Sequence, residues 1–292
     1  MRRREFLTAS CAGLASLGGA ASVVRGQRQP TTRLPGESEA SYRTRLARIR
    51  AAQAAQAARA RAESRDYYEL RRYEIETDAQ KAGFDAFAKD AAIPALNRNG
   101  IDPVGVFYPW EDLSPIYVLL RHKSLASVAQ LTQRLSEDEE FLRKGADFLD
   151  APADKPAYKR MEVQLMVSFE GMKKLETPIK SPGRVLQLRT YESPSVKTGQ
   201  KKIEMFNTAE IDIFRKTGLH PVFFGETLAG DKMPNLTYML VFNDMNERKA
   251  NWKRFGSDPQ WRALRAIPEY ADKRILCGIT NLYLKPAGYS QI

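Results

Sequence analysis

Two pairs of side chains in the sequence could bind a ligand, and both pairs have the same spacing. Arg71 and Tyr73 lie in a Leu-Arg-x-Tyr-Glu pattern that recurs 118 residues later with Arg189 and Tyr191. An arginine can hold a carboxylate through two parallel hydrogen bonds, and a tyrosine combines an apolar ring with a hydroxyl group. The four residues therefore predict a site for a small hydrophobic or anionic ligand.

The same four residues also have a purely structural interpretation. The chain supplies carboxylates near both arginines, among them Glu69, Glu74 and Glu192. A buried guanidinium needs such a partner, because an unpaired buried charge costs several kcal/mol, on the order of 3–5. In this alternative the arginines form internal ion pairs and the tyrosines fill space between two sheets.

The repeated pattern belongs to a duplication of the whole body of the chain. With the same spacing, Gly100-Ile101-Asp102-Pro103-Val104 corresponds to Gly218-Leu219-His220-Pro221-Val222. Hydrophobic periodicity in each copy predicts the order strand, helix, strand, strand, helix, strand. This βαββαβ order is the ferredoxin-like arrangement, so the fold class is α+β with two tandem ferredoxin-like domains.

A ferredoxin-like sheet carries helices on one face, so its other face must be covered. Two copies can cover each other if their sheets face inward and the helices lie outside, which gives a pseudo-twofold α+β barrel. Side chains alternate along a strand, and if Leu70 and Leu188 point to the helices, the arginine and tyrosine pairs point into the barrel interior. The predicted segments are a signal peptide at 1–26, a linker with an Arg/Ala-rich helix at 27–66, domains at 67–172 and 185–287, and a linker at 173–184.

The motifs resemble those of the NIPSNAP family within the dimeric α+β barrel superfamily. The resemblance rests on the two Leu-Arg-x-Tyr-Glu strands, on the two Gly-x-x-Pro-Val stretches, and on Asp258-Pro259-Gln260-Trp261 before the last strand. In the first copy Glu139 and Phe141 replace the proline and the tryptophan. The resemblance covers residues 67–287 and implies a barrel, but it implies no particular chemistry, because one fold hosts many functions.

The N-terminus has the features of an export signal. Arg3-Arg4-Glu5-Phe6-Leu7 resembles the twin-arginine motif, and a weakly apolar run rich in Ala, Gly and Ser follows. The sequence therefore predicts export through the twin-arginine route to the periplasm or another extracytoplasmic compartment. An uncleaved membrane anchor is the alternative. No later segment is apolar for long enough to span a bilayer.

Residues 27–66 hold most of the excess positive charge of the mature chain. They carry nine arginines against four acidic residues, whereas the whole chain has a formal net charge of +11. Alanine, arginine, glutamine and glutamate favour a helix, whose only apolar stripe is Tyr42, Leu46 and Ile49. No basic groove with interleaved aromatic residues follows, so nucleic acid is not an expected partner.

The mature chain contains few residues that could bind a metal or a cofactor. Cys11 lies in the export signal, which leaves Cys277 as the only cysteine of the mature chain, and His122 and His220 are the only histidines. These residues have no metal-ligand spacing, and neither histidine falls in a predicted helix where a haem ligand is common. The sequence predicts neither a metal nor a cofactor.

Three functions remain open at this point. The first is an exported, non-catalytic binding or structural protein, which can form homo-oligomers. The second is a cofactor-independent enzyme of the monooxygenase or isomerase type that acts on a small hydrophobic or anionic substrate in the barrel interior. The third is an envelope protein that uses its arginine-rich helix to hold a partner. A pocket with convergent polar groups favours the second function, and a filled barrel favours the first.

Overall fold

The computed structural model describes residue 33 and residues 35–292. The chain divides into two compact units, residues 1–60 and residues 61–292. The predicted signal peptide at 1–26 lies outside the described residues.

The described residues of the first unit lie mainly in helix α1, which begins at Glu39 and continues past the boundary of the unit to Glu63. Alanine and arginine dominate this helix, and just before it Glu37 accepts a hydrogen bond from Arg45 at 2.8 Å. Among residues 33 and 35–292, no helix combines the length and apolar character needed to cross a bilayer.

The second unit is built on a closed barrel of eight antiparallel strands in the order β1-β3-β2-β8-β5-β7-β6-β4. Each half of the chain supplies four neighbouring strands, in the order β4-β1-β3-β2 or β8-β5-β7-β6, which is the ferredoxin-like order. The halves join where β2 pairs with β8 and where β4 pairs with β6. The strands are β1 (Tyr67–Glu74), β2 (Val104–Pro109), β3 (Ile116–His122), β4 (Arg160–Ser168), β5 (Val185–Glu192), β6 (His220–Ala229), β7 (Asn235–Phe242) and β8 (Gly278–Pro286).

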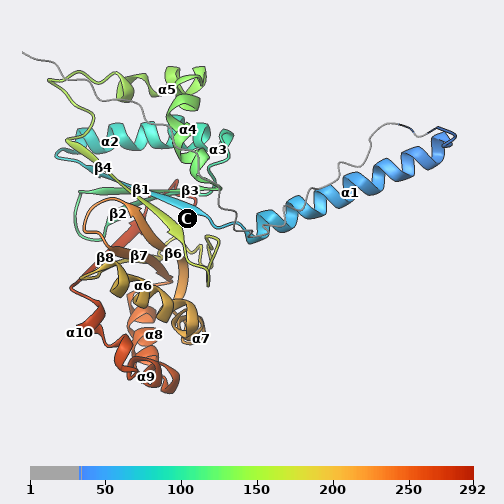
Figure 1. The fold of residues 1–292 in the computed structure, drawn as a ribbon. Coiled ribbons are helices and arrows are strands. Elements are labelled where there is room, and N and C mark those ends of the chain that lie inside the picture. Colours follow the sequence, from blue (N-terminus) through green and yellow to red (C-terminus); the bar gives the residue numbers. More distant parts are fainter. Residues whose placement is uncertain (1–32, 34) are drawn as a thin grey trace, which may run out of the picture. The chain divides into compact units, whose positions relative to one another are not determined.

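The helices cover the outside of this barrel, and those of the two halves lie on opposite sides of it (Figure 1). The predicted pseudo-twofold barrel with external helices is therefore confirmed. The first-half helices are α2 (Asp78–Phe87), η1 (Ala88–Ala92), α3 (Ile93–Arg98), α4 (Leu125–Ser136) and α5 (Glu139–Leu149). The second-half helices are α6 (Val196–Met205), η2 (Phe206–Glu210), α7 (Ile211–Lys216), α8 (Met245–Ser257), α9 (Pro259–Arg265), η3 (Pro268–Tyr270) and α10 (Asp272–Ile275).

The long helix after the first strand of each half contains one π-helical turn at the same repeat position. These turns are η1 and η2, and the helix continues after each of them as α3 or α7. Single π-turns inserted in α-helices occur often at functional sites, because they widen the helix and redirect its side chains. In both halves the turn faces the sheet, with Ala88 and Phe206 buried at its first position.

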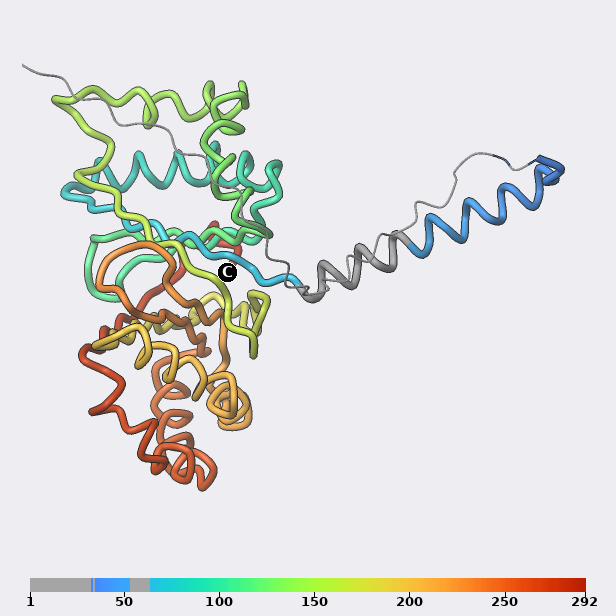
Figure 2. The backbone as a smooth tube through the Cα atoms, in the orientation of Figure 1, coloured from blue at the N-terminus to red at the C-terminus, as the bar shows by residue number. Residues whose placement is uncertain are grey.

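The barrel interior is filled by apolar side chains from both halves. Tyr68, Leu70, Phe107, Leu186 and Leu188 belong to one buried cluster there, all at most 5% exposed. Separate apolar clusters lie between the sheet and the helices of each half. The tube in Figure 2 shows the resulting layers, with the barrel between the first-half helices and the second-half helices.

Candidate functional site

Arg71, Tyr73, Arg189 and Tyr191 do not point into the barrel interior, and that prediction is wrong. Leu70 and Leu188 belong to the interior cluster, whereas Tyr73 and Tyr191 belong to the clusters beneath the helices. Because side chains alternate along a strand, Arg71 and Arg189 share the helix-facing side with these tyrosines. Strands β1 and β5 are also four positions apart around the barrel, so the two pairs form two separate groups rather than one site.

The reversal fits the narrow interior of an eight-stranded barrel, which side chains can fill completely. Aliphatic residues such as Leu70 and Leu188 fill it without any polar group that needs a partner. An arginine on the outer side can reach solvent at the edge of the helix layer, and the side chain of Arg71 keeps 22% of its surface exposed. The interior site that the sequence predicted for a ligand or substrate is thus occupied by the chain itself.

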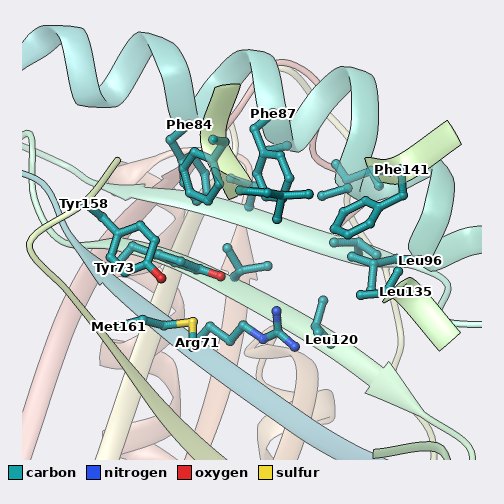
Figure 3. Close-up of a pocket in the computed structure, with 18 of the residues that line it drawn as sticks. Arg71, Tyr73, Phe84, Phe87, Leu96, Leu120, Leu135, Phe141, Tyr158 and Met161 are labelled. Carbon is teal, nitrogen blue, oxygen red and sulfur yellow. The ribbon is translucent and has the colours of Figure 1, made fainter. Parts of the chain in front are cut away.

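A pocket of about 370 Å³ lies between the sheet and the helices of the first half (Figure 3). Arg71 and Tyr73 line it from β1, and its other walls come from β2, β3, β4 and the helices from α2 to α5. This volume falls in the range of about 300–1,000 Å³ that is typical of small-molecule sites. Most of the lining is apolar, and its polar members are Arg71, Tyr73, Thr132, Ser136 and Tyr158.

Arg71 is the only charged residue among those that line the pocket. It donates from Nε to Oε1 of Glu69 at 2.6 Å, and the other oxygen of Glu69 lies 3.1 Å from Nε2 of His122. The Nδ1 atom of His122 in turn lies 3.1 Å from the hydroxyl of Ser127. Figure 3 shows the guanidinium end of Arg71 on the pocket floor, pointing toward Leu120. The network behind Arg71 therefore holds this side chain in place along the pocket.

The pKa of Glu69 reflects this network. Burial acts to raise it, but the hydrogen bond with His122 and the charge of Arg71 outweigh burial, and the pKa lies below its usual value. Glu69 is therefore an ionised partner of Arg71 at neutral pH. The alternative given above, in which the arginine pairs with a carboxylate of the chain, applies to Arg71 and Glu69.

The aromatic wall of the pocket is organised around Tyr73. Its ring contacts that of Tyr158 edge to face at a centroid distance of 5.2 Å, and that of Phe84 at 5.1 Å. Phe148 stacks on Phe87 at 4.1 Å on the helix side. Such ring pairs add about 0.5–1.5 kcal/mol each beyond area burial, so this wall is stiff.

In the second half, large aromatic residues stand where the first half has small ones, and they pack into the corresponding space. Phe206 occupies the repeat position of Ala88, and Phe224 that of Val106. The strand pairing makes Tyr238 the counterpart of Val118, since Arg189 faces Tyr238 across β5 and β7 as Arg71 faces Val118 across β1 and β3. The substituted residues are Ala88, Val106 and Val118 against Phe206, Phe224 and Tyr238.

These aromatic residues pack closely together in the second half. The ring of Phe206 lies 5.3 Å from that of Phe224 and 5.5 Å from that of Tyr238. The hydroxyl of Tyr238 lies 2.9 Å from that of Tyr191, which accepts a hydrogen bond from Arg189 at 3.0 Å. Arg189 and Tyr191 are thus brought together, but in a packed core. Of the predicted site residues, Arg71 and Tyr73 line the pocket of the first half, and Arg189 and Tyr191 do not.

A buried ion pair completes the core of the second half. Lys202 and Glu210 occupy the repeat positions of Phe84 and Ala92, and their charged atoms lie 3.2 Å apart. Both residues are at most 2% exposed, and the ammonium also lies 5.0 Å from the ring centre of Phe206. Burial raises the pKa of Glu210 against the effect of Lys202.

The residues that create the pocket were missed from the sequence. Ala88 and Val106 carry no chemistry of their own, but the 118-residue repeat pairs them with two phenylalanines, and that difference in size was a usable signal. Val118 was harder to find, because the chain from Phe224 to Tyr238 is two residues longer than the chain from Val106 to Val118, which shifts the spacing. Within the described part of the chain, His, Cys, Asp and Glu side chains do not gather in the groups of three that a metal ion requires.

The sequence of residues 186–291 matches the model of the NIPSNAP family. The second half of the chain is a NIPSNAP domain. No curated protein matches the chain. Among solved structures, a NIPSNAP-like domain protein from Burkholderia xenovorans aligns with 37% of the chain and 90% of its own length, at 16% identity and a TM-score of 0.34.

Two larger structures share the architecture of the whole barrel. A protein from Fusobacterium nucleatum, described as a candidate monooxygenase, covers 76% of this chain and 93% of its own length at 8% identity, with a TM-score of 0.53. A second candidate monooxygenase, from Lactobacillus acidophilus, covers 76% and 94% at 8% identity, with a TM-score of 0.50. At such low identity the likeness shows the fold alone.

Proposed function

We propose that the first half of the barrel binds a small, mainly apolar molecule that carries a hydrogen-bond acceptor such as a carbonyl group. The observation that carries this proposal is the exchange of aromatic residues for small ones between the halves. Ala88, Val106 and Val118 leave open the space that Phe206, Phe224 and Tyr238 fill in the second half.

The charge of the site favours an acceptor rather than a strongly anionic ligand. Glu69 already balances the charge of Arg71 through the 2.6 Å contact, so the pair is neutral as a whole. A guanidinium that points into an apolar pocket still offers N–H donors, and a hydrogen bond from a charged donor contributes about 1.5–3 kcal/mol. Arg71 would therefore select ligands with an oxygen acceptor at that end.

The proposal is for binding rather than turnover. The polar groups that line the pocket are a guanidinium, two phenols and two aliphatic hydroxyls, which orient a ligand. Glu69 and His122, which could move a proton, lie behind Arg71 and do not belong to the lining. A non-catalytic binding protein fits this arrangement better than an enzyme does.

The test compares the pocket before and after it is filled. Isothermal titration calorimetry with 2-acetylnaphthalene is expected to show binding to the unmodified protein. Ala88→Phe together with Val118→Tyr installs the residues of the second half, and the new tyrosine can bond to Tyr73 as Tyr238 bonds to Tyr191. We expect this variant to fold and to lose binding by at least about tenfold, which is 1.4 kcal/mol.

Ala129→Phe provides the matched control, because it adds a side chain of the same size at an exposed position of α4. It should bind as the unmodified protein does. If the filled variant is folded and binds equally well, or if the unmodified protein shows no binding, the pocket is not a ligand site.

We also infer that the protein is exported through the twin-arginine route, with Arg3 and Arg4 as the recognised pair. The support is the sequence Arg3-Arg4-Glu5-Phe6-Leu7 and the weakly apolar run after it. Replacing both arginines by lysine should retain the protein in the cytoplasm when cells are fractionated. Undiminished delivery outside the cytoplasm would overturn this inference.

A further inference from the structure

The second half carries two arginines, Arg189 and Arg248, on its helix-facing side. The charge of Arg189 acts on the buried carboxylate of Glu210, but that carboxylate forms its ion pair with Lys202. Arg189 on β5 and Arg248 on α8 form no ion pair within residues 33 and 35–292, although both side chains are partly buried. The Nε atom of Arg189 is buried and has no hydrogen-bond partner among the described residues. Burial and mutual repulsion oppose two guanidinium groups in one place. At Arg189 burial acts to lower the pKa, but the neighbouring Tyr238 and Tyr191 outweigh it and the pKa is raised.

Several contacts place these two arginines in one cluster. The guanidinium carbon of Arg189 lies 4.9 Å from the ring centre of Trp252. The indole N–H of Trp252 donates to Oε1 of Gln187 at 2.7 Å, and the same oxygen accepts from Nε of Arg248 at 3.2 Å. Arg248 also lies 4.6 Å from the ring centre of Tyr283. The charge of Arg189 adds to burial in lowering the pKa of Arg248, so the two cations interact.

The duplication shows that this charge excess is particular to the second half. Gln187 stands at the repeat position of Glu69, which is the carboxylate that pairs with Arg71 in the first half. Arg248 stands four residues after the N-cap of α8, where α4 has Val128. Relative to the first half, one negative charge has been removed and one positive charge has been added at the same place in the fold.

The surroundings of the cluster hold the guanidinium groups in fixed positions. The side-chain amide of Gln187 donates to Asn281 at 2.6 Å, and Asn281 donates to the hydroxyl of Tyr283 at 3.0 Å. Gln187 and Tyr283 face each other across β5 and β8, as do Arg189 and Asn281. A pair of arginines that is ordered before binding loses less entropy when an oxyanion arrives.

We propose that Arg189 and Arg248 form an oxyanion-binding site for a carboxylate or phosphate group, separate from the pocket of the first half. Arginine presents donors in a planar fork that matches the oxygens of both groups. Both arginines keep part of their surface exposed, so an anion can reach them from solvent. Neutralisation of two like charges supplies the gain on binding.

The experiment measures the melting temperature of the full chain in sodium phosphate, sodium acetate and sodium chloride at equal ionic strength. A bound anion stabilises the folded state by RT ln(1 + [L]/Kd), so a specific site gives a rise that grows with anion concentration. We expect phosphate or acetate, compared with chloride, to raise the melting temperature. The anion with the larger effect identifies the preferred group.

Two substitutions test whether the rise in melting temperature comes from anion binding at this cluster. Arg248→Gln is expected to fold with little loss in chloride, since it removes one of two repelling charges, and to weaken the apparent affinity for the anion by about tenfold or more. Gln187→Glu restores the carboxylate of the first half and is expected to abolish the response in the same way. Arg215→Gln is the matched control, because Arg215 already pairs with Glu176 at 2.7 Å. That variant should keep the full response to the anion.

The results that would overturn the proposal are equally distinct. If no oxyanion raises the melting temperature above that in chloride, the cluster binds none. If Arg248→Gln and Arg215→Gln reduce the anion-dependent rise in melting temperature equally, that rise comes from general screening of positive charge. Neither outcome depends on binding in the pocket of the first half, whose test uses a neutral ligand.

Discussion

Arg71 and Glu69 are joined at 2.6 Å on the helix-facing side of β1, where the arginine also lines a pocket. The corresponding residues of the second half, Arg189 and Gln187, lie above a closed aromatic core. One duplicated strand therefore has two different roles in the same barrel. The first half has a pocket beside the neutral pair of Arg71 and Glu69. The second half has Arg189, which forms no ion pair within the described chain, above a packed aromatic core.

We predict that Arg71, whose charge is balanced by Glu69, distinguishes ligands that carry a hydrogen-bond acceptor from those that do not. Arg71→Met should leave the apolar wall in place and remove the N–H donors. The unmodified protein is expected to prefer 2-acetylnaphthalene over 2-ethylnaphthalene by about tenfold, as one hydrogen bond from a charged donor provides. In the variant this preference should nearly vanish. Competition calorimetry of the two compounds measures it, and an unchanged preference would show that Arg71 does not contact the ligand.

The low pKa of Glu69 predicts a loss of stability in acid. A carboxylate whose pKa is lowered by folding contributes stability above its unfolded pKa of about 4.3, and that contribution is lost as the pH falls through the folded pKa. Glu69→Gln removes this contribution. Unfolding in urea between pH 7 and pH 3 should show a smaller decrease in the free energy of unfolding for the variant. Parallel curves for the two proteins would contradict the assignment.

The buried pair of the second half predicts a strongly non-additive response. Lys202→Phe alone leaves the charge of Glu210 buried without its partner, which costs about 3–5 kcal/mol. The double change Lys202→Phe and Glu210→Ala installs the two residues of the first half and should recover most of that loss. Urea unfolding of the single and double variants measures the coupling. Additive losses would show that the two groups do not stabilise each other.

The division of the chain into two units predicts that residues 61–292 fold alone. This boundary keeps Asp66, which is fully buried and accepts hydrogen bonds from Arg121 and Lys174. The truncated protein should be soluble and melt within a few degrees of the full chain. If it can be obtained only as an aggregate, the N-terminal unit is integral to the fold.

The repeat in the sequence was sufficient to predict the barrel, because two ferredoxin-like halves leave only a few ways to cover their sheets. The direction of the side chains on β1 could not be predicted. Both Leu70 and Tyr73 are buried, so alternation separates two covered faces without saying which one is inside. The choice depends on the width of the closed barrel, which is a property of all eight strands together.

The signal for the pocket in the sequence is indirect. The pocket results from side chains that are small rather than from side chains that are reactive, and only comparison with Phe206, Phe224 and Tyr238 reveals it. The anion cluster depends likewise on the exchange of Glu69 for Gln187, which a search for shared motifs passes over. In a duplicated chain, the differences between equivalent positions indicate function, whereas the shared residues indicate the fold.

Native mass spectrometry of the protein purified from its own source tests the central claim most directly. The unmodified protein should carry extra mass from a bound small molecule, and this mass should disappear when the protein is denatured. The variant with Ala88→Phe and Val118→Tyr, expressed in the same cells, should carry no such mass. Retention by both proteins would place the molecule elsewhere. A ligand-free unmodified protein that also fails to bind 2-acetylnaphthalene would contradict the account.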